Sequence, residues 1–319
     1  MKVSLKEYSF ITMRTFEQSK KGMVFFMKKV IFKGCGTALV TPFTNDGINF
    51  EELRKLIEFQ ILEGVDSLII CGTTGESSTM SLEEKKSVID FSVKVANKRV
   101  PIIAGTGGNN TKDVISMSKY AESVGVDGLL IVTPYYNKTT QAGLIKHYTE
   151  IAQNVKLPII LYNVPSRTGI NIEPQTCIEL AKIPNIVGIK EASGNISQVA
   201  KISHLCQDEL AIYSGNDEQI VPILSLGGLG VISVLSNIHP KFVHNIVTDY
   251  LSGNWQKACA SQLYAIPLID ALFTEVNPIP VKYAMNKIGF NCGIPRLPLV
   301  ELTEKNKEKL DTALKNFEL

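Results

Sequence analysis

The run Ile186-Val187-Gly188-Ile189-Lys190 is a short apolar stretch that ends on a lysine, and the polar stretch Glu191-Ala192-Ser193-Gly194-Asn195 follows it at once. An apolar run of about five residues bounded by turn residues is typical of a strand that is buried on both faces. The lysine is therefore expected at the carboxyl end of a buried strand. Most lysines at such positions simply carry their ammonium group into solvent, so the position alone establishes no role.

Runs of the same kind recur along the chain and alternate with longer stretches of helical period. The predicted strands cover residues 37–40, 67–71, 102–105, 128–132, 159–162, 186–190, 211–214 and 230–234. Between them, apolar residues such as Leu53, Leu56 and Ile57 share one helix face. Ser81 and Glu84 have the spacing of a capping box at a helix start. Strand and helix signals therefore alternate along most of the sequence.

This alternation predicts an α/β fold, a closed (β/α)8 TIM barrel, which typically takes about 250 residues. The alternative is an open doubly wound sheet, which would carry a G-x-G-x-x-G turn after its first strand. Here that turn is Thr41-Pro42-Phe43-Thr44-Asn45-Asp46-Gly47, which favours the barrel. After the barrel, residues 254–273, 280–287 and 299–317 have helical patterns. We predict an N-terminal extension (1–26), a catalytic barrel (27–251) and a C-terminal helical subdomain (252–319).

Charge and cysteine content exclude several classes of function. The 319 residues include 33 Lys and Arg against 31 Asp and Glu, a net charge of +2, and no dense basic patch suggests a nucleic-acid or membrane-surface partner. The six cysteines form no C-x-x-C pair and the four histidines lie far apart, so we expect reduced thiols and no metal site. Charged residues interrupt every apolar stretch of residues 1–26, which argues against a signal peptide or membrane span and for a flexible extension of a cytoplasmic protein.

Residues suited to chemistry follow several of the predicted strands. In a (β/α)8 barrel, the loops after the carboxyl ends of the strands form the active face. The second strand is followed by Gly72-Thr73-Thr74-Gly75-Glu76, the fifth ends on Tyr162, and the sixth ends on Lys190. A neutral lysine amine can attack a ketone to form a Schiff base, and a nearby phenol can shuttle the protons that this reaction needs. Each residue alone is a weak signal, but together they predict an aldolase-type site.

Four motifs give the chain a specific resemblance. They are Gly72-Thr73-Thr74-Gly75-Glu76, Thr133-Pro134-Tyr135-Tyr136-Asn137, the stretch from Tyr162 to Gly169, and Gly188-Ile189-Lys190-Glu191-Ala192. From about Phe32 to its end, the chain resembles the dihydrodipicolinate synthase family of pyruvate-dependent class I aldolases. The resemblance implies condensation of pyruvate with L-aspartate 4-semialdehyde, a step of diaminopimelate and lysine biosynthesis. It also implies a cytoplasmic homotetramer of two tight dimers.

The resemblance further implies a role for each matching residue. Lys190 is expected to form the Schiff base itself, without a separate cofactor, and Tyr162 to act as general acid and base. Thr73 and Tyr136 are expected to complete a hydroxyl relay, with Tyr136 reaching into the neighbouring subunit's site. The expected substrate-binding residues are Thr74 for the pyruvate carboxylate, Ile232 and Gly215 at the pyruvate pocket, and Arg167 for the carboxylate of the semialdehyde.

Two other functions remain as alternatives. A sialic-acid or keto-sugar-acid lyase would use the same Schiff base with another aldehyde, and Arg167 argues against it. The other is a barrel kept as a binding or regulatory protein that has lost its chemistry, and the intact Lys190, Tyr162, Thr73 and Tyr136 argue against it. One departure concerns regulation: family members that lysine inhibits carry histidines after the Gly-Thr-Thr loop, where this chain has Leu82 and Lys85. We therefore expect weak or absent inhibition by lysine.

Overall fold

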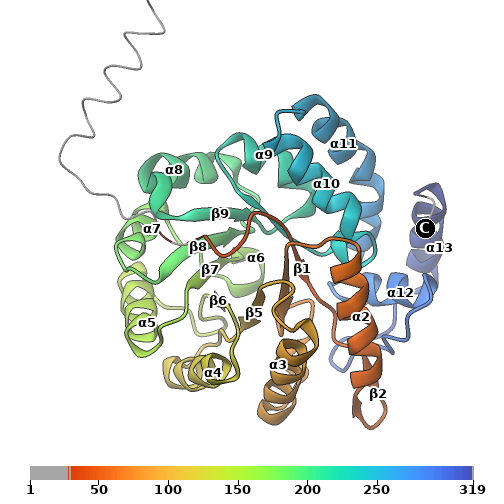
Figure 1. Cartoon of the computed structure of the whole chain (residues 1–319), viewed down its shortest axis with the longest axis horizontal. Helices are drawn as coiled ribbons and strands as arrows, with labels where there is room; N and C mark the ends of the chain where they lie inside the picture. The colour runs from red at the N-terminus through yellow and green to blue at the C-terminus, as the bar shows by residue number, and fades with distance from the viewer. Residues whose placement is uncertain (1–27, 29, 318–319) are drawn as a thin grey trace, which may run out of the picture.

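The computed structural model of the chain describes residue 28 and residues 30–317, so the predicted extension over residues 1–26 lies outside the described part. Eight parallel strands close into a barrel in the order β1-β10-β9-β8-β7-β6-β5-β4 (Figure 1), which confirms the predicted fold. They are β1 (Gly34–Ala38), β4 (Ser67–Ile70), β5 (Ile102–Gly105), β6 (Gly128–Val132), β7 (Ile159–Asn163), β8 (Ile186–Glu191), β9 (Ala211–Ser214) and β10 (Gly230–Ser233). The loop after β1 holds a small hairpin, β2 (Phe43–Thr44) and β3 (Gly47–Ile48), which the sequence analysis treated only as a turn.

Helices surround the barrel and connect its strands (Figure 1). They are α2 (Phe50–Leu62), α3 (Leu82–Ala96), α4 (Thr111–Val124), α5 (Gln141–Asn154), α6 (Pro165–Thr168), α7 (Pro174–Ala181), α8 (Ile196–Cys206), α9 (Ile220–Ser225) and α10 (Pro240–Leu251), with the short 3-10 turns η1 (Ser77–Thr79), η2 (Gln207–Glu209), η3 (Asp217–Gln219) and η4 (Leu235–Asn237). Within the described residues, no helix is both long and apolar enough to cross a membrane.

The part of the chain after α10 is helical. It contains α11 (Trp255–Leu272), α12 (Ile279–Lys287) and α13 (Glu304–Asn316), which lie on the side of the barrel where α10 packs (Figure 1). The last helix begins five residues later than predicted. The Glu275 carboxylate accepts hydrogen bonds from the Thr303 backbone and hydroxyl, at 3.1 and 2.6 Å, and so holds the chain just before the helix starts. The domain boundaries drawn from the sequence remain predictions.

Short polar residues begin many of the barrel helices. Each caps a helix by accepting a hydrogen bond from a backbone N–H of the first turn, and they are Asn49, Ser81, Asn110, Thr140 and Asn195. The predicted capping box is confirmed: the Glu84 N–H donates to the Ser81 hydroxyl at 3.1 Å, and the Ser81 N–H donates to the Glu84 carboxylate at 2.8 Å. Local sequence therefore sets where these helices begin.

The first strand differs from its predicted position. Residues 37–40 were expected, but β1 starts at Gly34, and Val40 leaves the sheet by donating its N–H to the Asn237 side chain at 3.0 Å. The two glycines of β1 lower its local strand signal. Packing requires glycine at position 36, because a Cβ there would lie 2.7 Å from Ile69 Cδ1 and 2.9 Å from Phe32 Cζ. Tertiary packing inside the barrel thus outweighs local propensity here.

Two apolar cores position the site. The larger core lies between the barrel and its helices, and the smaller one fills the barrel interior with side chains that include Ile69, Ile160 and Ile232. Phe32 closes the amino end of the barrel, where its ring stacks on Tyr213 at 4.5 Å between centroids. The Tyr213 hydroxyl also donates to the Phe32 carbonyl at 2.7 Å. With one end closed in this way, the interior opens at the carboxyl ends of the strands.

Candidate active site

Lys190 and Tyr162 lie side by side near the carboxyl ends of adjacent strands. They are register partners in β8 and β7, and the Lys190 Nζ atom lies 4.5 Å from the centroid of the Tyr162 ring. Their exposed fractions are only 6% and 7%. The structure therefore brings together the amine and the phenol that the sequence analysis selected, in a site shielded from solvent.

The space around Lys190 depends on Gly215, which follows β9. A Cβ on Gly215 would lie 3.1 Å from the Lys190 Cε atom and 2.6 Å from the Ala192 Cβ atom, so a larger residue would press on the lysine chain. Ile232 in β10 is fully buried in the same interior cluster as Tyr162 and Ala192. Gly215 therefore leaves room beside the lysine chain, and the interior cluster that contains Tyr162 is apolar.

The residues that follow Tyr162 and Lys190 in each strand fix the pair from behind. Asn163 and Glu191 are also register partners, and the Asn163 amide donates to the Glu191 carboxylate at 3.0 Å. The same carboxylate accepts from the Ser193 backbone at 2.7 Å and from the Gln198 amide at 3.2 Å. Because successive strand residues face opposite sides, this network locks the strands without entering the pocket. Asn163 and Glu191 had no predicted role, although their position directly after Tyr162 and Lys190 was a usable signal.

Asp217 is a second buried acid, and it was not among the predicted site residues. One oxygen of its carboxylate accepts from the backbone N–H groups of Val234 and Leu235, at 3.0 and 2.9 Å. Its other oxygen is buried and has no hydrogen-bond partner among the described residues. Burial raises the pKa of Asp217, while hydrogen bonds and the nearby Lys190 charge act in the opposite direction. A buried acid thus contributes to the electrostatics around the amine.

The Thr73–Thr74 loop lies at the end of β4 on the same rim. Thr74 is 3% exposed, and its hydroxyl accepts a hydrogen bond from the Asn277 amide at 3.0 Å. Thr73 is partly buried, and its carbonyl accepts from the Glu76 N–H at 3.0 Å, which closes a tight turn. Asn277 was not selected from the sequence, because it comes from a segment more than 200 residues further along the chain.

Two predicted site residues stand apart from this group in the single chain. Tyr136 is 93% exposed and adopts a φ of 68°, so it projects from its loop into solvent. Arg167 lies on the short helix α6, and its side chain is exposed. Arg167 follows Tyr162 by five residues and so remains near the rim. Tyr136 could act on a lysine site only if it reached another subunit.

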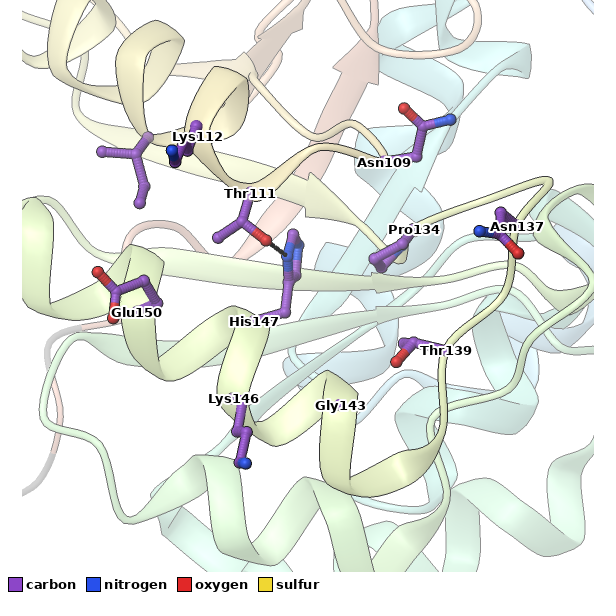
Figure 2. Close-up of a pocket in the computed structure, with 11 residues that line it drawn as sticks. Asn109, Thr111, Lys112, Pro134, Asn137, Thr139, Gly143, Lys146, His147 and Glu150 are labelled. Atoms are coloured by element: carbon purple, nitrogen blue, oxygen red, sulfur yellow. Dashed lines mark hydrogen bonds between the residues drawn. The ribbon is translucent and has the colours of Figure 1, made fainter.

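A cavity of about 570 Å³ lies between the first turns of α4 and α5, and Figure 2 shows its lining. None of the predicted catalytic residues lines it. His147 from α5 points toward Thr111 in α4, and its Nδ1 atom lies 2.9 Å from the Thr111 hydroxyl. Burial lowers the pKa of His147 to about 4, so this histidine is neutral near pH 7. A second cavity, of about 190 Å³, has Leu82, Lys85 and Tyr135 in its wall.

Comparison with known proteins shows which family the chain belongs to. Residues 31–317 match the model of the dihydrodipicolinate synthetase family. The chain is 57% identical to 4-hydroxy-tetrahydrodipicolinate synthase 1 of Clostridium acetobutylicum, an alignment that covers 91% of this chain and 99% of the relative. A synthase of Clostridium perfringens is 59% identical over 89% of this chain and 98% of its own length. The crystal structure of dihydrodipicolinate synthase from Thermotoga maritima has a TM-score of 0.89 and 42% identity, over 91% of this chain and all of that one. The chain therefore belongs to the dihydrodipicolinate synthetase family.

Proposed function

We propose that the protein condenses pyruvate with L-aspartate 4-semialdehyde to give 4-hydroxy-tetrahydrodipicolinate, with Lys190 as the Schiff-base residue. The observation that carries this proposal is the buried amine of Lys190, 4.5 Å from the Tyr162 ring at the open end of the barrel. The chain's relatives of 53–59% identity bear the name of this synthase. The protein is accordingly a lyase of the class I aldolase type in the lysine and diaminopimelate branch.

The reaction begins at the ketone of pyruvate. The Lys190 amine attacks the carbonyl carbon, water leaves, and an iminium forms, with Tyr162 supplying and removing protons. Loss of a methyl proton converts the iminium to an enamine, whose carbon attacks the aldehyde of the second substrate. The amine of that substrate then adds to the iminium carbon and displaces Lys190 as the ring closes. The lysine is regenerated, so no separate cofactor takes part.

The remaining residues hold the substrates. Thr74 donates to the pyruvate carboxylate, and Ile232 and Gly215 shape the space for its methyl group. Arg167 binds the carboxylate of the semialdehyde, since a planar guanidinium can form two parallel hydrogen bonds with it. Thr73 and Tyr136 extend the proton path from Tyr162, with Tyr136 supplied by a second subunit. The proposed assembly is a cytoplasmic homotetramer built from two such dimers.

Two experiments in sequence separate the synthase from a binding protein and from a lyase that uses another aldehyde. Borohydride is added in the presence of pyruvate, and peptides are analysed by mass spectrometry. We expect a stable adduct on Lys190, and an unlabelled Lys190 would contradict any Schiff-base function. The labelling-competent protein is then given aspartate semialdehyde or N-acetylmannosamine. Turnover of the second compound alone would identify a lyase of the sialic-acid type instead.

A further inference from the structure

A fully buried ion pair ties the C-terminal helices to the Thr73–Thr74 loop. The Lys282 Nζ atom, in α12, lies 2.8 Å from the Glu76 Oε1 atom, in the loop after β4. The side chains are 0% and 1% exposed, and among the described residues this is the one ion pair with both side chains fully buried. Burying two charges costs free energy that their attraction repays only with good geometry, so such a pair is a poor source of net stability. What it supplies instead is a fixed geometry.

The backbone of Glu76 is strained, so contacts from outside the loop are needed to keep it in this conformation. Its φ of 54° and ψ of 35° lie in the left-handed region, which is strained for a residue with a side chain. Its N–H closes the turn onto the Thr73 carbonyl at 3.0 Å. Its Oε2 atom accepts from the Arg296 backbone at 2.9 Å, while Oε1 accepts from Lys282. The carboxylate is therefore held at both oxygens by the C-terminal segment.

The same segment also contacts Thr74. Asn277, two residues before α12 begins, donates its amide N–H to the Thr74 hydroxyl oxygen at 3.0 Å. Because this hydroxyl oxygen already accepts a hydrogen bond, its own hydrogen remains available to donate to an acceptor in the pocket, such as a carboxylate. Phe43 completes the contact, with Lys282 Nζ 4.2 Å and the Arg296 guanidinium carbon 4.1 Å from its ring centroid. Asn277 and Lys282, at the start of α12, thus contact the loop at Thr74 and at Glu76.

We infer that Lys282 and Glu76 are positioning residues, which set the Thr73–Thr74 loop for pyruvate through a contact between the barrel and its C-terminal helices. This inference rests on the proposed function, because it assigns the loop to the pyruvate carboxylate. The pair does not touch the substrate. Loss of the ion pair shifts the Thr74 hydroxyl so that its hydrogen no longer points at the pyruvate carboxylate. This weakens pyruvate binding more than it slows the later steps.

The test compares Glu76→Gln and Lys282→Met with the wild-type enzyme. The fraction of Lys190 trapped by borohydride is measured against pyruvate concentration. We expect the pyruvate concentration for half-maximal labelling, and the KM for pyruvate, to rise about tenfold. This is the effect of losing one hydrogen bond to a charged group, here the bond from the Thr74 hydroxyl to the pyruvate carboxylate. The labelling plateau at saturating pyruvate and the KM for aspartate semialdehyde should change by less than about twofold, since Lys190 and Arg167 are untouched.

Two further variants separate positioning from folding. Tyr148→Phe removes another fully buried hydrogen bond, from the Tyr148 hydroxyl in α5 to the Ile131 carbonyl in β6 at 3.0 Å. It should lower the thermal midpoint without changing half-maximal labelling. If the single variants do not fold, the double variant Glu76→Gln, Lys282→Met leaves no unpaired buried charge and is measured in their place.

Three outcomes would overturn the inference. The first is half-maximal labelling within about twofold of wild type in folded variants of the pair. The second is an equal rise in the pyruvate concentration for half-maximal labelling in Tyr148→Phe, at a matched loss of thermal stability. The third is a wild-type enzyme that pyruvate does not label at all, which would overturn the proposed function as well. Normal wild-type labelling with unchanged pair variants would overturn the positioning role alone.

Discussion

At the scale of single residues, neighbouring positions in two strands divide the work of the site. Tyr162 and Lys190 meet inside the barrel, while Asn163 and Glu191, one residue further on, bond to each other behind it. The alternation of a β-strand places chemistry on one face and support on the other. A short sequence can thus carry a reactive group and the residue that fixes its strand.

The Tyr162→Phe variant separates the role of the Tyr162 hydroxyl from that of its ring. Phenylalanine keeps the aromatic face against Lys190 but cannot transfer protons. We expect kcat to fall by about 10²- to 10⁴-fold, the range for loss of a general acid and base, while borohydride with pyruvate still labels Lys190 after longer incubation. Steady-state rates and the labelled peptide are measured together. An unchanged kcat would remove Tyr162 from the proton path.

His147 should make the stability of the protein depend on pH. Its pKa is lowered to about 4 in the folded protein, so between pH 6.5 and pH 4 the unfolded chain binds more protons than the folded one. The contribution of His147 to stability is therefore largest above pH 6.5 and falls as the pH drops through this window, by about 2 kcal/mol at pH 5.

The measurement for His147 is the thermal midpoint at pH 7.5 and pH 5. In His147→Gln the side chain is uncharged throughout, so the loss on acidification should be smaller than in wild type. The exposed His204 provides a matched control, and His204→Gln should lose as much as wild type. An identical loss in the wild type and in His147→Gln would show that this histidine does not sense the change.

A site residue could be predicted from the sequence only where a local pattern marks it. Lys190 and Tyr162 were found because each ends an apolar run, and a barrel places all such ends on one rim. Asn277 and Lys282 could not be found in this way. They lie more than 200 residues from Thr74 and Glu76, and their contacts arise only when the C-terminal helices pack against the loop. Long-range side-chain contacts leave no local pattern in a single sequence.

At the scale of elements, seven of the eight barrel strands begin at the predicted residue, and β1 is the exception. β5, β6 and β9 have the predicted bounds, whereas β1 is shifted by three residues at its start. In β10, Gly230 permits the close approach of the β1 backbone at Gly34, its register partner. Hydrophobic patterns do not record such a requirement, because it belongs to the neighbouring strand.

Gly230→Ala tests this close approach. An added Cβ would lie 2.0 Å from the Gly34 carbonyl oxygen, which the paired strand cannot move without breaking the ladder. We expect a loss of about 3 kcal/mol or more in stability, or failure to fold. Gly108→Ala is the matched control, because its Cβ would meet only Val114 Cγ2, at 3.5 Å. Equal urea midpoints for the two variants would contradict the packing argument.

At the scale of the whole molecule, the 190 Å³ cavity bears on whether lysine inhibits the enzyme. Leu82 and Lys85 lie in the wall of the 190 Å³ cavity, together with Ser77, Asn109 and Tyr135. A cationic Lys85 disfavours a lysine ligand there, so we expect little inhibition of the enzyme at millimolar lysine. Lys85→Ala should increase any inhibition, because it removes the like charge. Clear saturable inhibition of the wild type would contradict this prediction.

The exposed position of Tyr136 leads to a prediction about assembly. If Tyr136 completes the site of a second subunit, a Tyr136→Phe subunit regains activity when its partner carries Lys190→Ala and an intact Tyr136. Mixing the two inactive variants, with subunit exchange verified by native mass spectrometry of mass-tagged chains, should restore about a quarter of wild-type activity, because half of the dimers are mixed and one of their two sites is complete. Tyr162→Phe mixed with Lys190→Ala is the control. Tyr162 and Lys190 belong to one chain's site, so no mixed dimer contains a complete site and no activity should return. Exchange without recovery in the first mixture would show that Tyr136 does not act across subunits.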